Sequence, residues 1–240
     1  MIFLGKTTLT ILFDNSIFLL WFCNSFICVI LFCMGYDDAL RLAQERLAQL
    51  PPQAVCEACG ARYKQGEFFL PWFNRERAFS TVSETHQILW LHYLTASGTK
   101  EMSGRLIAYR EVAPALFYEP NFYKRAVKPL VDCFGKNPEN LIITGESLGG
   151  KAAALGDASV TINVLPYLPV TFIIWAGCEE FPPDGNILFD QTSKTWFEAE
   201  DLAVLASVAA YELIGAQKSR ISVSEKETSH KWLYGHEDNY

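Results

Sequence analysis

Apolar residues recur along the chain with two different spacings, which predict two kinds of element. Apolar positions three or four apart predict helices at residues 36–50, 83–96, 121–134 and 200–214. Short runs rich in branched and aromatic residues predict strands at residues 105–110, 160–165, 170–175 and 186–189, with a hairpin or meander in 67–80. Helices and strands come in blocks and do not alternate regularly. The pattern therefore predicts an α+β fold, a single domain over residues 34–215 with a mixed or antiparallel sheet and packed helices.

Proline and glycine indicate where these elements begin and end. Asn137-Pro138-Glu139 combines a capping residue, a first-turn proline and an acid, and this predicts the start of another helix. Pro129 predicts a kink within the 121–134 helix. Gly215 is expected to end the last helix, because the chain then turns polar and loses its periodicity. Residues 216–240 are accordingly interpreted as a polar tail.

Residues 1–33 differ from the rest of the chain and form a hydrophobic leader. They carry only two charged side chains, Lys6 and Asp14. Residues 17–33 are almost entirely apolar, at the lower limit of length for crossing a bilayer. Two interpretations stay open: a membrane anchor formed by residues 17–33, or upstream sequence translated by mistake, with the true start at Met34. The leader lacks a basic start, so it is a poor signal peptide.

Charge and cysteine content narrow the class of protein. With 20 Lys and Arg against 27 Asp and Glu, the net charge is -7, and the absence of a basic stripe argues against nucleic-acid binding. Only four cysteines lie outside the leader, too few and too irregular for a disulfide framework, which favours a reducing, cytoplasmic location. Cys56 and Cys59 form a C-x-x-C pair. It is interpreted either as half of a metal or redox site or as two ordinary cysteines in a turn.

The segment Gly145-Glu146-Ser147-Leu148-Gly149 matches G-x-S-x-G, the pattern that places a nucleophilic serine on a sharp strand-to-helix turn. For that geometry, residues 141–144 would have to be a strand. The competing interpretation makes residues 138–148 a helix that Gly149 ends. Downstream histidines occur only in the polar tail, which disfavours a serine hydrolase.

An acidic segment between two predicted strands is the main candidate for a ligand site. Glu and Asp are seldom buried without partners, so carboxylates bounded by apolar runs are expected at a sheet edge or a pocket mouth. The predicted acidic pocket is formed by Trp175, Glu179, Glu180, Phe181 and Asp190, together with Asp157. These carboxylates could bind a ligand or a metal, or they could cap backbone amides at strand ends. His92, within the 83–96 helix, is expected to be a hydrogen-bonded histidine rather than a ligand.

The chain also resembles the domain-of-unknown-function family 3786 of bacteria and archaea. The resemblance rests on six segments in order: 89–94, 104–111, 122–125 with 129–130, 148–150 with 156–157, 175–181 and 187–190. It implies that Gly149 and Gly150 follow a helix, and that an acid often stands at the position of Cys178. Some members of the family look to be joined to iron–sulfur domains. The resemblance therefore also implies a link to anaerobic iron–sulfur or one-carbon cofactor metabolism. It specifies no activity and no cofactor.

The sequence therefore predicts a ligand-binding or accessory protein, with either a small-molecule ligand or an iron–sulfur protein as partner. One alternative is a serine hydrolase that uses Ser147. Another is a scaffold partner of an iron–sulfur protein, which would bind through exposed aromatic residues such as Trp72 and Phe73.

Overall fold

The computed structural model describes residues 12–13, 16–17, 36–112 and 118–234, and their side chains over 40–112 and 118–222. The chain divides into two compact units, residues 1–42 and 43–240. In the first unit, β1 (Leu12–Phe13) and β2 (Ser16–Ile17) pair antiparallel, and α2 (Tyr36–Ala48) begins. Most of the predicted anchor lies outside the described residues. None of the helices described has the length and apolar character needed to cross a membrane.

The second unit begins with a small module of two helices and a three-stranded meander. Its elements are α3 (Pro52–Cys59), β3 (Arg62–Lys64), β4 (Glu67–Trp72), β5 (Arg75–Ala78), η1 (Phe79–Thr81) and α4 (Glu84–Thr95). All three strands pair antiparallel in sequence order. The hairpin or meander predicted for residues 67–80 is confirmed as the β4–β5 hairpin, and β3, before the predicted range, makes it a three-stranded meander. The β4–β5 turn places Phe73 and Asn74 at positive φ, 50° and 57°, the backbone of a two-residue hairpin turn.

This turn corrects the expectation that Trp72 and Phe73 are exposed. Trp72 is 0% and Phe73 1% exposed. The Phe73 amide donates to the Val164 carbonyl at 3.2 Å, so the turn docks on the larger sheet. Asn74 Nδ2 also donates to the Gly149 carbonyl at 3.1 Å. The two aromatic side chains belong to the core and cannot serve as a docking surface.

The larger sheet has five strands, and all neighbouring pairs are antiparallel. Its order is β6 (Leu106–Ala108), β10 (Asp184–Asp190), β9 (Leu168–Trp175), β8 (Ala158–Leu165) and β7 (Lys151–Ala152). Pro166 and Tyr167 form the tight β8–β9 connection. Val160, Phe172 and Ile187 stand opposite one another across the three long strands and are fully buried. They are directed to one face of the sheet, where the helices pack.

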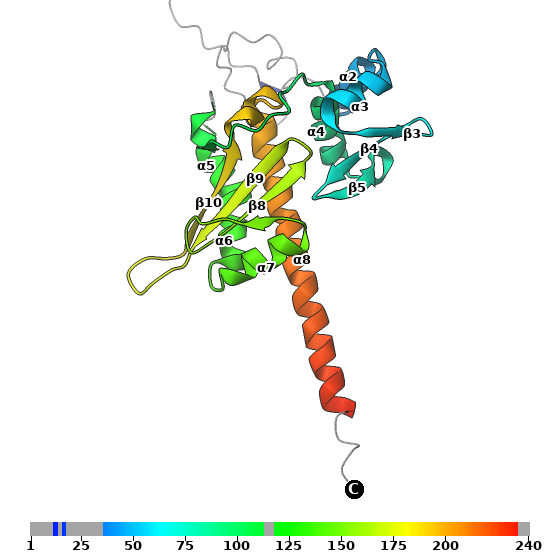
Figure 1. Cartoon of the computed structure of the whole chain (residues 1–240). Coiled ribbons are helices and arrows are strands. Elements are labelled where there is room, and N and C mark those ends of the chain that lie inside the picture. The colour runs from blue at the N-terminus through cyan, green and yellow to red at the C-terminus, as the bar shows by residue number, and fades with distance from the viewer. Residues whose placement is uncertain (1–11, 14–15, 18–35, 113–117, 235–240) are drawn as a thin grey trace, which may run out of the picture. The chain divides into compact units, whose positions relative to one another are not determined.

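Helices α5 to α8 form the layer on that face (Figure 1). They are α5 (Glu119–Phe122), the π-helix η4 (Tyr123–Val127), α6 (Lys128–Phe134), α7 (Glu139–Ser147) and α8 (Ala199–Tyr234); short 3-10 turns η2 (Tyr109–Glu111) and η5 (Gln191–Thr195) precede α5 and α8. Glycines allow close contact between the layers. A Cβ at Gly145 of α7 would lie 2.5 Å from Val160, and one at Gly185 of β10 would lie 2.8 Å from Val131 of α6. The antiparallel sheet and packed helices confirm the predicted α+β class.

The predicted end of the last helix at Gly215 is wrong, because α8 continues to Tyr234. A glycine inside a helix costs only about 1 kcal/mol relative to alanine, so it weakens a helix without necessarily ending it. Just beyond it, Gln217 is 5% exposed and its side-chain oxygen accepts from Thr144 of α7 at 2.7 Å and from Arg220 at 2.8 Å. These bonds tie the continuing helix to α7.

Candidate functional site

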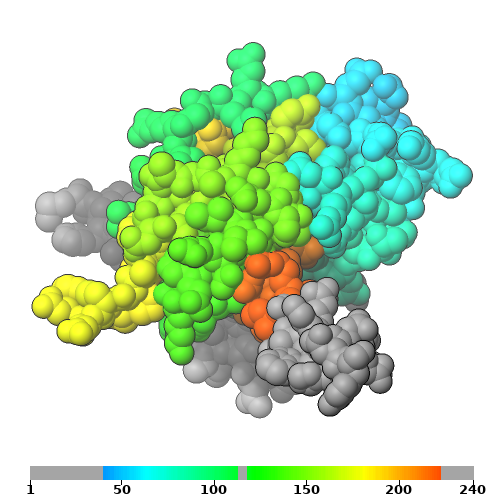
Figure 2. Space-filling model, turned by 60° about the horizontal axis from the view of Figure 1, so that its bottom comes forward, coloured from blue at the N-terminus to red at the C-terminus, as the bar shows by residue number. Residues whose placement is uncertain are grey.

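The loop between β9 and β10, residues 176–183, is the most exposed part of the predicted site. It stands out from the strands that it joins, as Figures 1 and 2 both show in yellow. Its base is fixed because Trp175 of β9 pairs with Asp184 of β10. A turn within the loop is closed by the Cys178 amide, which donates to the Phe181 carbonyl at 2.8 Å. The neighbouring β7–β8 loop also anchors it, since the Ala176 amide donates to Asp157 Oδ2 at 2.7 Å.

Three large apolar side chains are exposed in these two loops and at the end of β9, which leads into the first loop. Phe181 is 68% exposed, more than any other large hydrophobic residue whose side chain is described, while Trp175 is 40% and Leu155 37% exposed. The Trp175 indole lies against Gly156, where an added Cβ would be 3.3 Å from Nε1. Glu179 and Glu180 are exposed beside Phe181. Five of the predicted site residues therefore lie at one end of the sheet, on two adjacent loops and the end of β9: Trp175, Glu179, Glu180, Phe181 and Asp157.

Tyr123 and Asp184 extend this site and escaped the sequence interpretation. Pro129 has no N–H for the carbonyl four residues earlier, and the helix widens to the π form, in which the Lys128 amide donates to the Tyr123 carbonyl. The Tyr123 hydroxyl donates to Asp184 Oδ1 at 3.2 Å. Burial and the neighbouring Asp184 charge raise the pKa of Tyr123. The cue in the sequence was Pro182-Pro183, which ends the loop and marks Asp184 as the first residue of β10. In the structure Asp184 pairs with Trp175.

Asp190 does not belong to this site. It lies at the far end of β10, roughly 20 Å from Asp184 at about 3.3 Å per strand residue. Its carboxylate, in a residue only 2% exposed, accepts the backbone amides of Ser103, Gly104 and Thr192 and the hydroxyls of Ser103 and Thr192, at 2.7–3.1 Å. Burial alone would raise its pKa, but these hydrogen bonds outweigh burial and lower the pKa to about 2. The expectation that Asp190 joins Glu179 and Glu180 in a pocket is wrong; Asp190 instead fixes the loop before β6.

The structure does not form a nucleophile elbow at Ser147. Residues 141–144 belong to helix α7, and Ser147 is its last residue. The Ser147 hydroxyl donates to the Thr144 carbonyl at 2.7 Å, a local helix-end bond. Gly149 has φ +83°, so the helix ends on glycine as the competing interpretation and the family resemblance both implied. Its place at a helix end gives Ser147 none of the strand-to-helix strain on which such nucleophiles depend.

Cys56 and Cys59 lie in the last two turns of α3, so the expectation of a simple turn is wrong. Cys59 is fully buried and its thiol donates to the Val55 carbonyl at 3.0 Å. Burial raises the pKa of Cys59 to about 11, and burial together with the Glu57 charge also raises that of Cys56. Both shifts disfavour the thiolate that redox chemistry and metal binding require. Among the residues that the structure describes, no three His, Cys, Asp or Glu side chains are grouped so that they could hold a metal ion.

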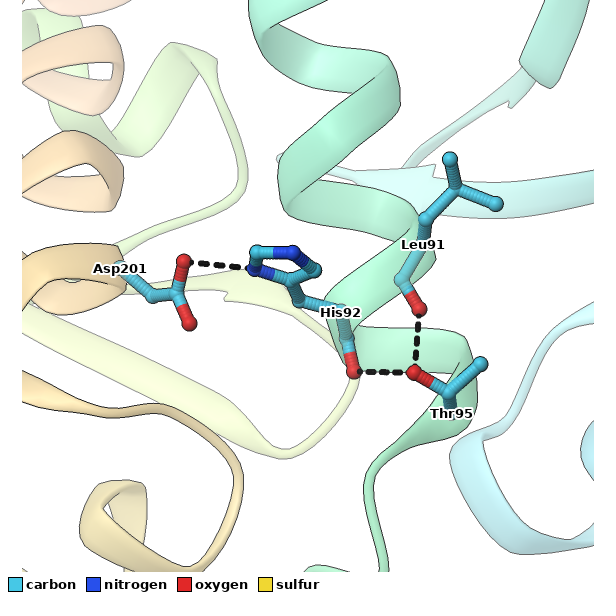
Figure 3. A network of polar contacts seen from close by, with 4 residues as sticks. All are labelled: Leu91, His92, Thr95 and Asp201. Atoms are coloured by element: carbon cyan, nitrogen blue, oxygen red, sulfur yellow. Dashed lines mark hydrogen bonds and ion pairs between the residues drawn. The ribbon is translucent and has the colours of Figure 1, made fainter. Parts of the chain in front are cut away.

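His92 forms a polar contact between two helices, α4 and α8. Its Nδ1 lies 2.8 Å from Asp201 Oδ1, across the contact between α4 and α8 (Figure 3). Thr95 closes the end of α4 by donating to the carbonyls of Leu91 at 2.8 Å and His92 at 3.3 Å. The histidine is hydrogen-bonded, as its sequence context predicted.

The comparisons with known proteins identify a family without an assigned activity. A family model described as "Domain of unknown function (DUF3786)" matches residues 51–212, more than half of the chain and nearly all of the α+β region. No curated protein and no solved structure matches the chain. The comparisons therefore give a family and no activity, and function has to be inferred from the geometry of the described residues.

Proposed function

We propose that this chain, which belongs to the DUF3786 family, is an accessory protein that binds a basic protein partner through its β9–β10 loop. The observation that carries this proposal is the exposure of two aromatic side chains. Phe181, on the loop, is 68% exposed and Trp175, at the paired base of the loop, is 40% exposed. Large exposed apolar groups that cluster on one surface commonly mark interaction sites. Tryptophan and other aromatic anchors supply much of the affinity in such interfaces.

The loop is built to present these side chains with little loss of entropy on binding. Pro182 and Pro183 restrict its second half, and Pro183 packs against Gly135 in the turn before α7, where an added Cβ would be 2.8 Å away. The Asp157 carboxylate holds its first residue. Because the loop is already ordered, binding requires less rearrangement, which favours affinity.

The charges around the loop select the chemistry of the partner. Residues 176–183 contain Glu179 and Glu180 and no Lys or Arg. Asp157 and Asp184 lie at the base of the loop, and the chain as a whole carries a net charge of -7. Opposite charge steers partners together and like charge repels them. The surface therefore fits a protein with a basic rim around an apolar hollow, and it disfavours nucleic acid and anionic lipid.

Other functions suggested by the sequence have less support in the geometry. A serine hydrolase would need Ser147 on a strained turn, and it lies at a helix end. A small-molecule pocket was expected to include Asp190, which is engaged elsewhere. The link to iron–sulfur or one-carbon metabolism stays a prediction from the family resemblance, and an iron–sulfur protein with a basic surface would satisfy the present proposal.

A peptide-binding assay tests the proposal. The probe is a fluorescent peptide of alternating Arg and Leu, with an alternating Glu and Leu peptide of the same length as control. The basic peptide should bind and the acidic one should not. Phe181→Ser should weaken binding about 10-fold or more, because burial of a Phe side chain is worth about 1.5–3 kcal/mol. Glu179→Gln with Glu180→Gln should weaken it and reduce its salt dependence.

Tyr211→Ala is the matched control, because Tyr211 is a 58% exposed aromatic on α8. It should leave peptide binding unchanged. Equal binding by the Phe181→Ser and Tyr211→Ala variants, or equal binding of the two peptides by the unmodified protein, would contradict the proposal.

A further inference from the structure

Two ion pairs connect helix α8 to the module formed by the meander and α4. His92 Nδ1, in the last turn of α4, lies 2.8 Å from Asp201 Oδ1 in the first turn of α8. The Arg77 guanidinium of β5 lies 2.5 Å from the Glu212 carboxylate. Asp201 and Glu212 are eleven residues apart, about 16 Å along a helix. The pairs therefore hold α8 at two separate points, and only the first contains a group that titrates near neutral pH.

The surroundings of His92 favour its protonated form. Burial disfavours the charge and Arg46 of α2 opposes it, but the hydrogen bond and charge of Asp201, supported by Glu200, outweigh both and raise the pKa of His92 above 6.5. The helix ends act in the same direction. A cation is stabilised near the carbonyl end of α4, and an anion is stabilised near the amide end of α8.

We propose that the His92–Asp201 pair is a proton-dependent clamp, which holds α4 against α8 when His92 is protonated and weakens when His92 becomes neutral (Figure 3). The neutral ring can still donate one hydrogen bond to Asp201, so the contact is weakened and not abolished. A histidine whose folded-state pKa is raised contributes stability that is fully present below its unfolded pKa. The contribution is lost as the pH rises from about 6.5 through the raised pKa.

A second histidine on the same helix, His86, lowers the stability of the folded protein at acidic pH. His86 Nδ1 lies 2.7 Å from Ser83 Oγ, and its ring packs edge-on against buried Trp72 at 4.9 Å. Burial lowers the pKa of His86, while the nearby charges of Glu212 and Arg77 act in opposite directions. Because burial disfavours the protonated ring, stability falls as the pH drops below about 6.5. Tyr93 on α4 and Cys59 of α3, whose carbonyl accepts the Tyr93 hydroxyl, have raised pKa values and stay neutral.

Two double-mutant cycles on the whole protein test the clamp. The first combines His92→Gln with Asp201→Asn, and the second, as control, combines Arg77→Gln with Glu212→Gln. Thermal unfolding is measured at pH 6.0 and pH 8.5. We expect the first pair to contribute about 2–4 °C to the Tm at pH 6.0, the shift that 1 kcal/mol gives in a chain of this size. Less than half of that should remain at pH 8.5. The contribution of the control pair should change much less between the two pH values, because its two charges act on His86 in opposite directions.

A titration of the imidazole signals by nuclear magnetic resonance gives a result even where the His92 variant does not fold. The His92 midpoint should lie above 6.5 and should fall in Asp201→Asn, while the His86 midpoint stays below 6.5 in both proteins. A coupling between His92 and Asp201 that is unchanged or larger at pH 8.5 would overturn the proposal. So would a His92 midpoint that Asp201→Asn leaves in place.

Discussion

At the scale of single residues, Asp190 illustrates a carboxylate whose whole hydrogen-bonding capacity is used by the fold. It accepts five bonds from Ser103, Gly104 and Thr192. Asp190→Asn would replace one acceptor oxygen by an amide that donates toward these donors. We expect a loss of about 1–3 kcal/mol in the free energy of unfolding, measured by urea denaturation at pH 7. Glu180→Gln, at an exposed position, should change it by less than about 0.5 kcal/mol.

The same residue predicts a pH dependence. Because the pKa of Asp190 is lowered from 3.8 to about 2, its contribution is present above pH 3.8 and is lost as the pH falls from there through 2. A shift of that size corresponds to about 2 kcal/mol. Between pH 5 and pH 2 the unmodified protein should therefore lose more stability than Asp190→Asn does. Parallel losses in the two proteins would show that the five bonds do not favour the ionised form.

At the scale of elements, Gly215 tests whether α8 continues as a helix. A glycine that ends a helix in the left-handed conformation resists alanine, whereas a glycine inside a helix is improved by it. Gly215 is absent from the glycines with positive φ, and a Cβ there meets no atom within 4 Å. Gly215→Ala should raise the free energy of unfolding by up to about 1 kcal/mol in urea. Gly149→Ala, at φ +83°, is the control and should lower it. A destabilising Gly215→Ala would place the end of the helix at residue 215.

Local patterns predicted most elements, because periodicity and capping residues act within a few residues of each position. Helices α4 and α7 and strands β8 to β10 follow such patterns. The errors arose where tertiary contacts decide. Gln217 holds α8 to α7 beyond a glycine. The Phe73-Asn74 turn contains no glycine, although tight hairpin turns usually carry Asn-Gly, Asp-Gly or Gly-Gly. It is stabilised by the hydrogen bond from the Phe73 amide to the Val164 carbonyl.

At the scale of the whole molecule, the candidate site shows what linear sequence could and could not predict. Trp175, Glu179, Glu180 and Phe181 are neighbours in the chain, so their common location was predictable. Asp157 is joined to this segment by two hydrogen bonds, one between its carboxylate and the Ala176 amide and one between its own amide and the Ile174 carbonyl. These contacts depend on the strand order β10-β9-β8. Asp190 was misplaced because Glu179 and Glu180 precede the first residue of β10, whereas Asp190 is its last residue. The extended strand therefore separates the two sets of carboxylates by its full length.

Site-directed photo-cross-linking tests the central proposal most directly. A photoreactive phenylalanine analogue is placed at position 181 and, as control, at position 211, in cells that express the full chain. We predict one dominant adduct from position 181, cross-linked at a basic surface of the partner. Its yield should fall when Glu179→Gln and Glu180→Gln are added, and it should not form from position 211. The same adducts from both positions, or an adduct at position 181 whose yield is undiminished by the loss of both acids, would contradict binding of a basic partner by the β9–β10 loop.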